Sequence, residues 1–284
     1  MSDGAQLHRS FLAWGDFRYA RISLLLCALA IAVYALYQPI GTPNGGTTLG
    51  YTLGVMAGLL VAWLAWFGIR RRRYGGADGL TELLSAHVYL GCAVALIALL
   101  HAGFHLHANV HTLALVLLLA VVGSGVFGAY AFWRMPDLMT ENRAGLTLGR
   151  MAALLAELDL TSRTLALAFP DDIVTAVGSA TEAPPITSTV RELATGAQRR
   201  AARARGMAAI ARVQAELLDG QGATPGEVLP LVRSLTQRVT LADRMYKDWR
   251  FRVLLLQWRA IHVPLTIALL AALTIHIVAV FYTW

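Results

Sequence analysis

Five long apolar blocks dominate the chain and are separated by polar residues. They cover residues 22–40, 51–69, 83–104, 113–133 and 261–282. A helix needs about 20 residues to cross the roughly 30 Å apolar core of a bilayer, and each block is close to that length. We therefore predict an all-α integral membrane protein, built as a bundle of five transmembrane helices.

A polar block of a different kind separates the fourth and fifth apolar blocks. Within residues 135–259, apolar residues at three- and four-residue steps predict helices over 146–169, over 190–218 and after Pro230. A loop is expected around Pro170, Pro184 and Pro185. We predict a helical cytoplasmic insertion between a first domain, residues 1–134, and the last membrane helix, residues 260–284. It contains no glycine-rich nucleotide loop and no flavin or iron–sulfur motif, so a structural or partner-binding role is expected.

The basic residues predict how the bundle is oriented. All 24 Lys and Arg residues fall in residues 1–21, in the loop at 70–73 or in the insertion with Arg134 before it. Because basic residues stay on the cytoplasmic side, we expect a cytoplasmic N-terminus and insertion and a periplasmic C-terminus, in a bacterial inner membrane. The leader, residues 1–20, is interpreted as an anchored amphipathic segment rather than a cleaved signal peptide.

Composition supports a membrane protein and excludes some of the ways in which it could bind a cofactor. Of the 284 residues, 57% are hydrophobic and only 14% are charged, against about a quarter charged in soluble domains. The net charge of +7 therefore indicates membrane topology rather than nucleic-acid binding. The two cysteines, Cys27 and Cys92, lie inside apolar blocks and form no covalent haem-attachment motif. Any haem would be bound non-covalently.

Histidines are the most informative residues, because an ionisable side chain inside a membrane helix usually has a function. Two blocks each carry a pair fourteen residues apart: His87 and His101 in the third block, His262 and His276 in the fifth. Fourteen residues return a helix to within about 40° of the same face and advance it by about 21 Å. Each helix thus presents one histidine near each side of the bilayer.

The predicted orientation makes the third and fifth helices parallel. His87 then lies at the depth of His262, and His101 at the depth of His276. Two imidazoles can occupy the two axial positions of a haem iron. We expect two haem b groups, one for each histidine pair, that pass electrons across the bilayer.

Other interpretations of the histidines stay open. The side chains could form hydrogen bonds between helices, or belong to a zinc site or a proton path, although no acidic residue accompanies them in the five blocks. His105, eighteen residues after His87, is a rival to His101 as the outer ligand. His107 and His111 are expected at a wet interface or beside a quinone or partner site.

Two further residues are candidates for the haem site. Gly91, four residues after His87, would let a flat macrocycle approach the helix, although close helix packing explains a glycine equally well. Arg259, three residues before His262, could meet a propionate of the inner haem or anchor the helix at the interface.

The histidine-bearing segments resemble the dihaem cytochrome b membrane domains of the ferric reductase and NADPH oxidase type. The likeness is carried by H-V-Y-L-G from His87, H-A-G-F-H from His101, S-G-V-F-G from Ser124, and the stretch from W-R-A-I-H-V-P-L at Trp258 to H-I-V-A-V-F-Y at His276. It covers roughly the membrane half of the chain and implies haem ligands at His87, His101, His262 and His276. The general plan is also similar to cytochrome b subunits of bacterial respiratory complexes.

These features predict an electron-transfer subunit of a hetero-oligomeric membrane oxidoreductase complex. The chain lacks the flavin and nicotinamide domain of the reductases, so electrons would move between a quinone or cytoplasmic donor and a redox partner, such as a cytochrome c, an iron–sulfur protein or a flavoprotein. An autonomous ferric-type reductase and a haem-free assembly or scaffold protein are the alternatives. A run of arginines could dock anionic membrane lipid or an acidic partner, or be a solvated helix face: Arg199, Arg200, Arg203, Arg205 and Arg212.

Overall fold

The computed structural model describes residues 11–37, 44–70, 77–106, 108–182, 196–218 and 224–283. It is 88% helical, and these described ranges contain no strand. Five of its helices are long and apolar enough to cross a membrane. The all-α membrane bundle predicted from the sequence is confirmed.

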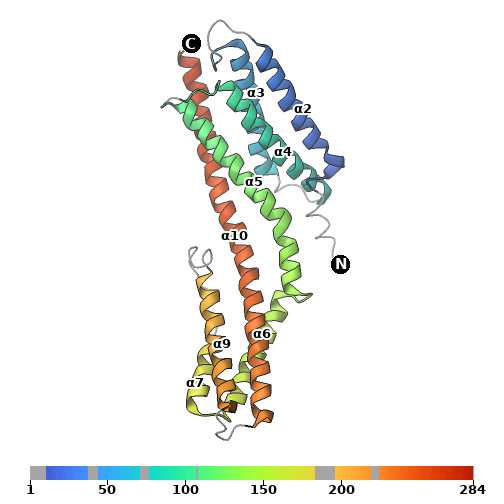
Figure 1. The fold of residues 1–284 in the computed structure, drawn as a ribbon. Coiled ribbons are helices and arrows are strands. Elements are labelled where there is room, and N and C mark those ends of the chain that lie inside the picture. The colour runs from blue at the N-terminus through green and yellow to red at the C-terminus, as the bar shows by residue number, and fades with distance from the viewer. Residues whose placement is uncertain are drawn as a thin grey trace. The chain divides into compact units, whose positions relative to one another are not determined.

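The described part of the chain is a succession of helices (Figure 1). They are α2 (Trp14–Leu36), α3 (Thr48–Arg70), α4 (Ala77–His101), α5 (Val110–Arg143), α6 (Leu148–Ala166), α7 (Asp171–Ala180), α9 (Ala197–Leu218) and α10 (Pro225–Thr283). The apolar spans lie in α2, α3, α4, α5 and α10.

These helices divide into two compact units. The membrane unit comprises residues 1–136 and 255–284, and the insertion unit comprises residues 137–254. Both α5 and α10 contribute residues to the two units, and each continues as one helix through the boundary, with Pro136 inside α5. The ends of the polar block are therefore marked by composition and not by a break in the helix.

In the membrane unit, α4 is the central helix. It packs against α2 and α3, and its span has the largest buried share of the five. Val94 and Ile97 of α4 are fully buried in a core that also includes Leu53 of α3, Leu115 of α5 and Leu269 of α10. The histidines of α4 are thus carried by the helix that lies deepest in the bundle.

Large apolar side chains cover the outside of the membrane unit. Leu24 and Leu25 of α2 are each 72% exposed, and Leu59 of α3 and Ile267 of α10 are exposed as well. A soluble protein rarely exposes contiguous apolar patches of this kind. Lipid chains would solvate these side chains, as the membrane-spanning character of the helices requires.

The insertion unit has an apolar core of its own. Ile173 and Val177 of α7 pack with Val213 of α9 and with Leu231 and Leu235 of α10. Burial of these aliphatic side chains, each of which is at most 1% exposed, supplies the main driving force for folding of the unit.

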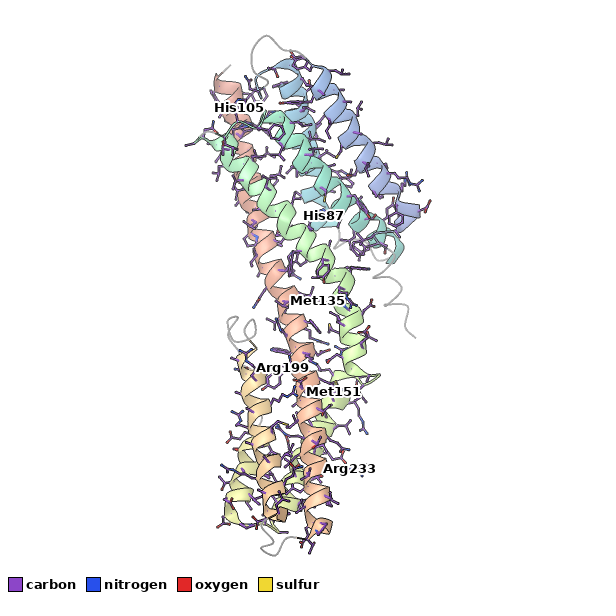
Figure 2. The ribbon with its side chains drawn as sticks, in the orientation of Figure 1. His87, His105, Met135, Met151, Arg199 and Arg233 are labelled. Atoms are coloured by element: carbon purple, nitrogen blue, oxygen red, sulfur yellow. The ribbon has the colours of Figure 1, made fainter. Side chains whose placement is uncertain are left out.

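Ion pairs join the helices of the insertion unit. Arg143 donates two hydrogen bonds to the carboxylate of Asp248, at 2.6 and 2.9 Å, and the Asp248 side chain is fully buried. Arg238 donates to Asp159 at 2.6 Å. Arg199 (Figure 2) pairs with Asp243, whereas the other four arginines of the basic run are exposed: Arg200, Arg203, Arg205 and Arg212.

The structure corrects two expectations for the insertion. Residues 167–170 form a turn, as expected around Pro170, but residues 171–180 then form α7, where the sequence predicted a continuing loop. Pro170 precedes the helix as its N-cap and acidic residues fill the first turn, which favours a helix start over a loop. In addition, α10 begins at Pro225, before Pro230. Pro184, Pro185 and the first part of the predicted 190–218 helix lie outside the described residues.

Only the end of the predicted leader falls within the described residues. Phe11 is 1% exposed, and its ring packs edge-on against Phe132 of α5, with 5.7 Å between the ring centroids. Tyr19 of α2 donates to the carboxylate of Glu82 on α4 at 2.9 Å. This end of the leader is therefore packed against the membrane helices.

Candidate functional site

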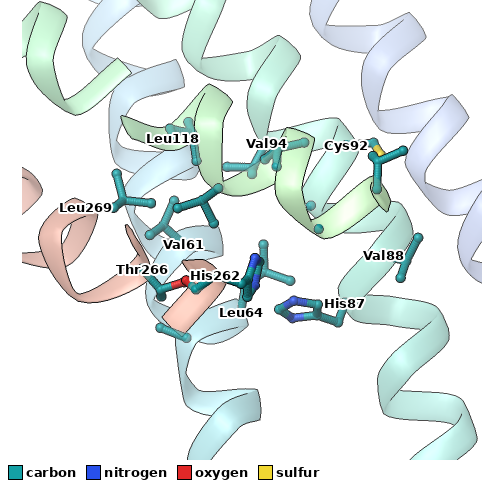
Figure 3. A pocket seen from close by; sticks show the side chains of 16 residues that line it. Val61, Leu64, His87, Val88, Cys92, Val94, Leu118, His262, Thr266 and Leu269 are labelled. Atoms are coloured by element: carbon teal, nitrogen blue, oxygen red, sulfur yellow. The ribbon is translucent and has the colours of Figure 1, made fainter. Parts of the chain in front are cut away.

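The four histidines predicted as ligands meet two by two in the membrane unit. His87 of α4 and His262 of α10 line one pocket, in which the His87 side chain points toward His262 (Figure 3), and the ring centroids of His101 and His276 lie 6.2 Å apart. The two histidines of each helix follow in the same order, so α4 and this part of α10 run in the same direction. The spacing of fourteen residues thus yields two sites along one pair of helices.

The pocket between His87 and His262, hereafter the two-histidine pocket, is lined by α3, α4, α5 and α10. The space between the lining atoms is about 620 Å³, and this figure includes the part that is open to the surroundings. Apart from the two imidazoles, its polar side chains are Cys92 and Thr266. The Thr266 hydroxyl donates to the backbone carbonyl of His262 at 2.8 Å. The imidazoles and the Cys92 thiol are therefore the pocket groups suited to bind a metal.

Hydrogen bonds determine which nitrogen of His262 is available to a ligand. The Ser124 hydroxyl lies 2.7 Å from Nδ1 of His262, and it donates its single hydrogen to the carbonyl of Val121 at 2.8 Å. The Ser124 oxygen consequently accepts the hydrogen of Nδ1. Nε2 of His262 is left with a lone pair, which is the form that a metal requires.

A second layer of contacts holds the His262 ring in place. The indole of Trp258 lies 5.3 Å from the His262 ring between centroids, and its Nε1 donates to the carbonyl of Ser124 at 2.7 Å. A Cβ atom at Gly128 would lie 2.1 Å from the Trp258 ring, so only glycine leaves room for the indole there. Ser124 therefore bonds the His262 ring directly, and Gly128 leaves room for the indole that lies beside it.

Small residues open space beside the two imidazoles. A Cβ atom added at Gly91 would meet nothing within 4 Å, so α4 presents bare backbone to the pocket at this point. At Gly125 of α5 the nearest atom to such a Cβ would be Cε1 of His262, at 3.5 Å. In its apolar lining and its donor atoms, the two-histidine pocket fits a haem b.

The second pair is joined by a third histidine. The His111 ring, at the start of α5, lies 5.0 Å from the His101 ring and 4.9 Å from the His276 ring between centroids. One ligand nitrogen from each residue lies within 4.8 Å of the other two, and all three side chains are half-buried. We refer to His101, His111 and His276 as the histidine trio.

Backbone contacts with α3 fix the His101 ring. Its Nδ1 lies 2.7 Å from the carbonyl oxygen of Gly50, and because a carbonyl can only accept, Nδ1 carries the hydrogen and Nε2 the lone pair. A Cβ atom at Gly54 would approach the His101 ring to 2.6 Å, and one at Gly45 to 3.1 Å. Glycine at position 54 is thus required for the observed place of the ring.

The trio fits a haem less well than the two-histidine pocket does. His111 is nearly equidistant from His101 and His276, so its ring lies beside the midpoint of the line that joins them. The macrocycle of a haem ligated by His101 and His276 would occupy that space. As the rings lie in the structure, His111 would have to move before a haem could enter.

The remaining predicted residues lie outside both clusters. His105 (Figure 2), the proposed rival of His101, is exposed in the segment between α4 and α5 and is not a member of the trio. Arg259 is exposed on α10, and its contact with a propionate stays a prediction. His107 lies outside the described residues.

The place of His111 in a ligand cluster was not predicted from the sequence, from which this residue was expected at a wet interface or beside a quinone or partner site. A signal was present, because a loop of only a few residues joins the end of the third block to the start of the fourth. Such a loop returns His111 to the membrane end that carries His101.

No family model, curated protein or solved structure matches this chain. The resemblance to ferric reductase and NADPH oxidase membrane domains stays a prediction from the histidine segments. Function is therefore inferred from the geometry of the two clusters.

Proposed function

We propose that this chain is a b-type cytochrome subunit that carries electrons across a membrane, with a haem b bound between His87 and His262. The observation that carries the proposal is the pairing of these imidazoles, from two parallel helices, in one apolar pocket. Histidine pairs on membrane helices also form simple hydrogen bonds. A pair that lines an apolar pocket, with a second histidine pair fourteen residues further along the same two helices, is better explained by bound ligands.

The residues of the pocket have separable roles in this proposal. His87 and His262 would ligate the iron, and the haem would supply a one-electron carrier. Ser124 orients the His262 ring and selects the tautomer whose Nε2 faces a ligand. The apolar lining excludes water, and exclusion of solvent is one way in which a protein tunes the reduction potential of a bound iron.

An electron carried across the membrane also needs a centre at the other end of the bundle. His101 and His276 lie fourteen residues beyond His87 and His262, about 21 Å along each helix. The sequence predicts a second haem b there, and this requires the His111 ring to turn away from its observed place. In either case the trio marks the second redox or ligand site of the chain.

The distribution of basic residues supports an orientation and a location for this activity. With the insertion unit in the cytoplasm and the C-terminus in the periplasm of a bacterium, the two-histidine pocket lies toward the cytoplasmic side. A quinone or a cytoplasmic donor and a periplasmic redox protein would then be the exchange partners. The exposed arginines of α9 suit a contact with anionic lipid or with an acidic partner subunit.

The proposal is tested by purifying the full chain from membranes in mild detergent and measuring its pyridine haemochrome spectrum. We expect non-covalent haem b, lost in His87→Ala and in His262→Ala and retained in His105→Ala, which alters an exposed histidine outside both clusters. A haem-free wild-type protein would instead favour the scaffold alternative. Reduction of ferric iron by the purified chain alone would favour the autonomous reductase.

A further inference from the structure

We infer that His101, His111 and His276 bind a single transition metal ion, in place of a second haem, through one nitrogen each. The site would take an ion that prefers imidazole ligands, zinc or copper being the usual ones. This inference goes beyond the proposed electron transfer through the two-histidine pocket and does not depend on it, because no residue is shared between the two clusters.

Two of the three separations within the trio match those of imidazoles around one tetrahedral ion. Bonds of about 2.0–2.1 Å from the metal to each nitrogen put the ring centroids roughly 5 Å apart. His111 lies 5.0 and 4.9 Å from its two partners, whereas the His101 and His276 rings are 6.2 Å apart and would have to approach each other by about 1 Å. The ligand nitrogens already lie within 4.8 Å of one another, so small side-chain rotations suffice to close the site on an ion.

Contacts of the His101 ring with Gly50 and Gly54 of α3 also favour metal binding by the trio. The Gly50 carbonyl takes the hydrogen of His101 Nδ1, which leaves Nε2 as the ligand and orients the ring, as the outer contacts of metal-bound histidines do. The close approach of His101 to Gly54 restricts movement of the ring in that direction.

The chemistry of the donor atoms limits which metal ions the trio could bind. Three neutral imidazoles with no carboxylate or thiolate among them, within the part of the chain described, do not suit calcium or magnesium, which prefer oxygen ligands. Three histidines leave a fourth position for water or another small ligand, as in open zinc sites. The same His111 ring that supplies the third ligand takes the space of the macrocycle, so an ion and a haem exclude each other here.

The test uses the full chain in detergent micelles after removal of bound metal with a chelator. Co²⁺ is added as a probe whose visible spectrum reports its ligands, and Zn²⁺ is added separately and counted by elemental analysis. We expect one ion per chain in the wild type and in His105→Ala, and at least about tenfold weaker binding in His111→Ala, because loss of even an outer contact of a metal site lowers affinity about 10–100-fold. Equal binding by His111→Ala and the wild type would overturn the inference.

A second measurement does not depend on the folding of a variant. X-ray absorption of the zinc-loaded wild type counts the imidazoles at the ion: three support the site, and two or fewer overturn it. The haem count separates this inference from the proposed function. One haem b and one copper ion per chain support both proposals, whereas a zinc ion supports the metal site alone, because zinc has no redox chemistry. Two haems overturn the metal site alone, and one ion without haem overturns the proposed electron transfer alone.

Discussion

The hydroxyl of Ser124 lies 2.7 Å from Nδ1 of His262, although the two residues are 138 positions apart in the chain. This contact connects α5 to α10 inside the membrane unit and decides which ring nitrogen faces the two-histidine pocket. The S-G-V-F-G segment of α5 thus contributes a positioning side chain to the site.

Ser124→Ala should therefore weaken haem binding without removing an iron ligand. Loss of a contact of this kind typically lowers metal affinity about 10–100-fold, so we expect a lower haem content after purification and a shifted reduction potential in the haem that remains. Redox titration of the purified protein measures both. Thr274→Val is the matched control, because Thr274 also bonds a carbonyl of α10 but is exposed. An unchanged potential in Ser124→Ala would refute the positioning role.

Gly91→Leu should block the two-histidine pocket from the α4 side. The added side chain would enter space where no atom now lies within 4 Å and where the proposed haem would lie. Forcing extra atoms into a filled site costs about 1–3 kcal/mol. Haem content should fall roughly 5- to 100-fold while the helical circular dichroism signal is kept. Gly123→Leu on the exposed side of α5 serves as the control and should retain haem. Normal haem content in Gly91→Leu would show that the cofactor does not occupy this space.

Gly54→Ala should disturb the histidine trio and spare the two-histidine pocket. The new methyl group would press on the His101 ring, which a Cβ atom at this position would approach to 2.6 Å. Metal binding by the trio should weaken, as measured by cobalt titration, while the haem spectrum stays as in the wild type. Gly58→Ala, one turn further along α3, adds the same methyl group where no atom lies within 4 Å. If both variants bind cobalt equally, Gly54 has no role in placing the His101 ring for metal binding.

Asp248→Ala should destabilise the insertion unit. Its carboxylate is fully buried and holds the Arg143 guanidinium through two hydrogen bonds. Removal of one partner of a buried ion pair costs about 3–5 kcal/mol, and we expect the lower end because Arg143 is partly exposed. Limited proteolysis of the full chain in micelles should then cleave residues 137–254 roughly a hundredfold faster, if cleavage follows local opening. Glu157→Ala, at an exposed position of α6, should leave the rate unchanged.

The sequence was sufficient to predict the fold class and the meeting of His101 with His276, for physical reasons that can be named. Length and hydropathy determine which segments can span a bilayer. Helical periodicity then determines which residues share a face, and the positions of basic residues determine which helices are parallel. The pairing of histidines follows from these rules without knowledge of any side-chain contact.

Other parts of the site depend on contacts that periodicity does not contain. His111 belongs to a different helix from His101, and its place depends on how the short connection between α4 and α5 turns. The approach of Gly54 to His101 depends on the rotation of α3 about its axis, which an almost uniformly apolar helix does not reveal. In the insertion, Pro170 suggested a loop, whereas the acidic residues after it favour the start of α7.

Because α4 and α10 run in parallel, the number of residues between the two histidines must be the same in both helices. One extra residue between His87 and His101 would turn one of these histidines about 100° away from its partner, whatever the rest of the bundle did. A compensating insertion between His262 and His276 would have to accompany it. Evolutionary change in the length of these segments is thereby restricted to paired events, while the connecting loops stay free to vary.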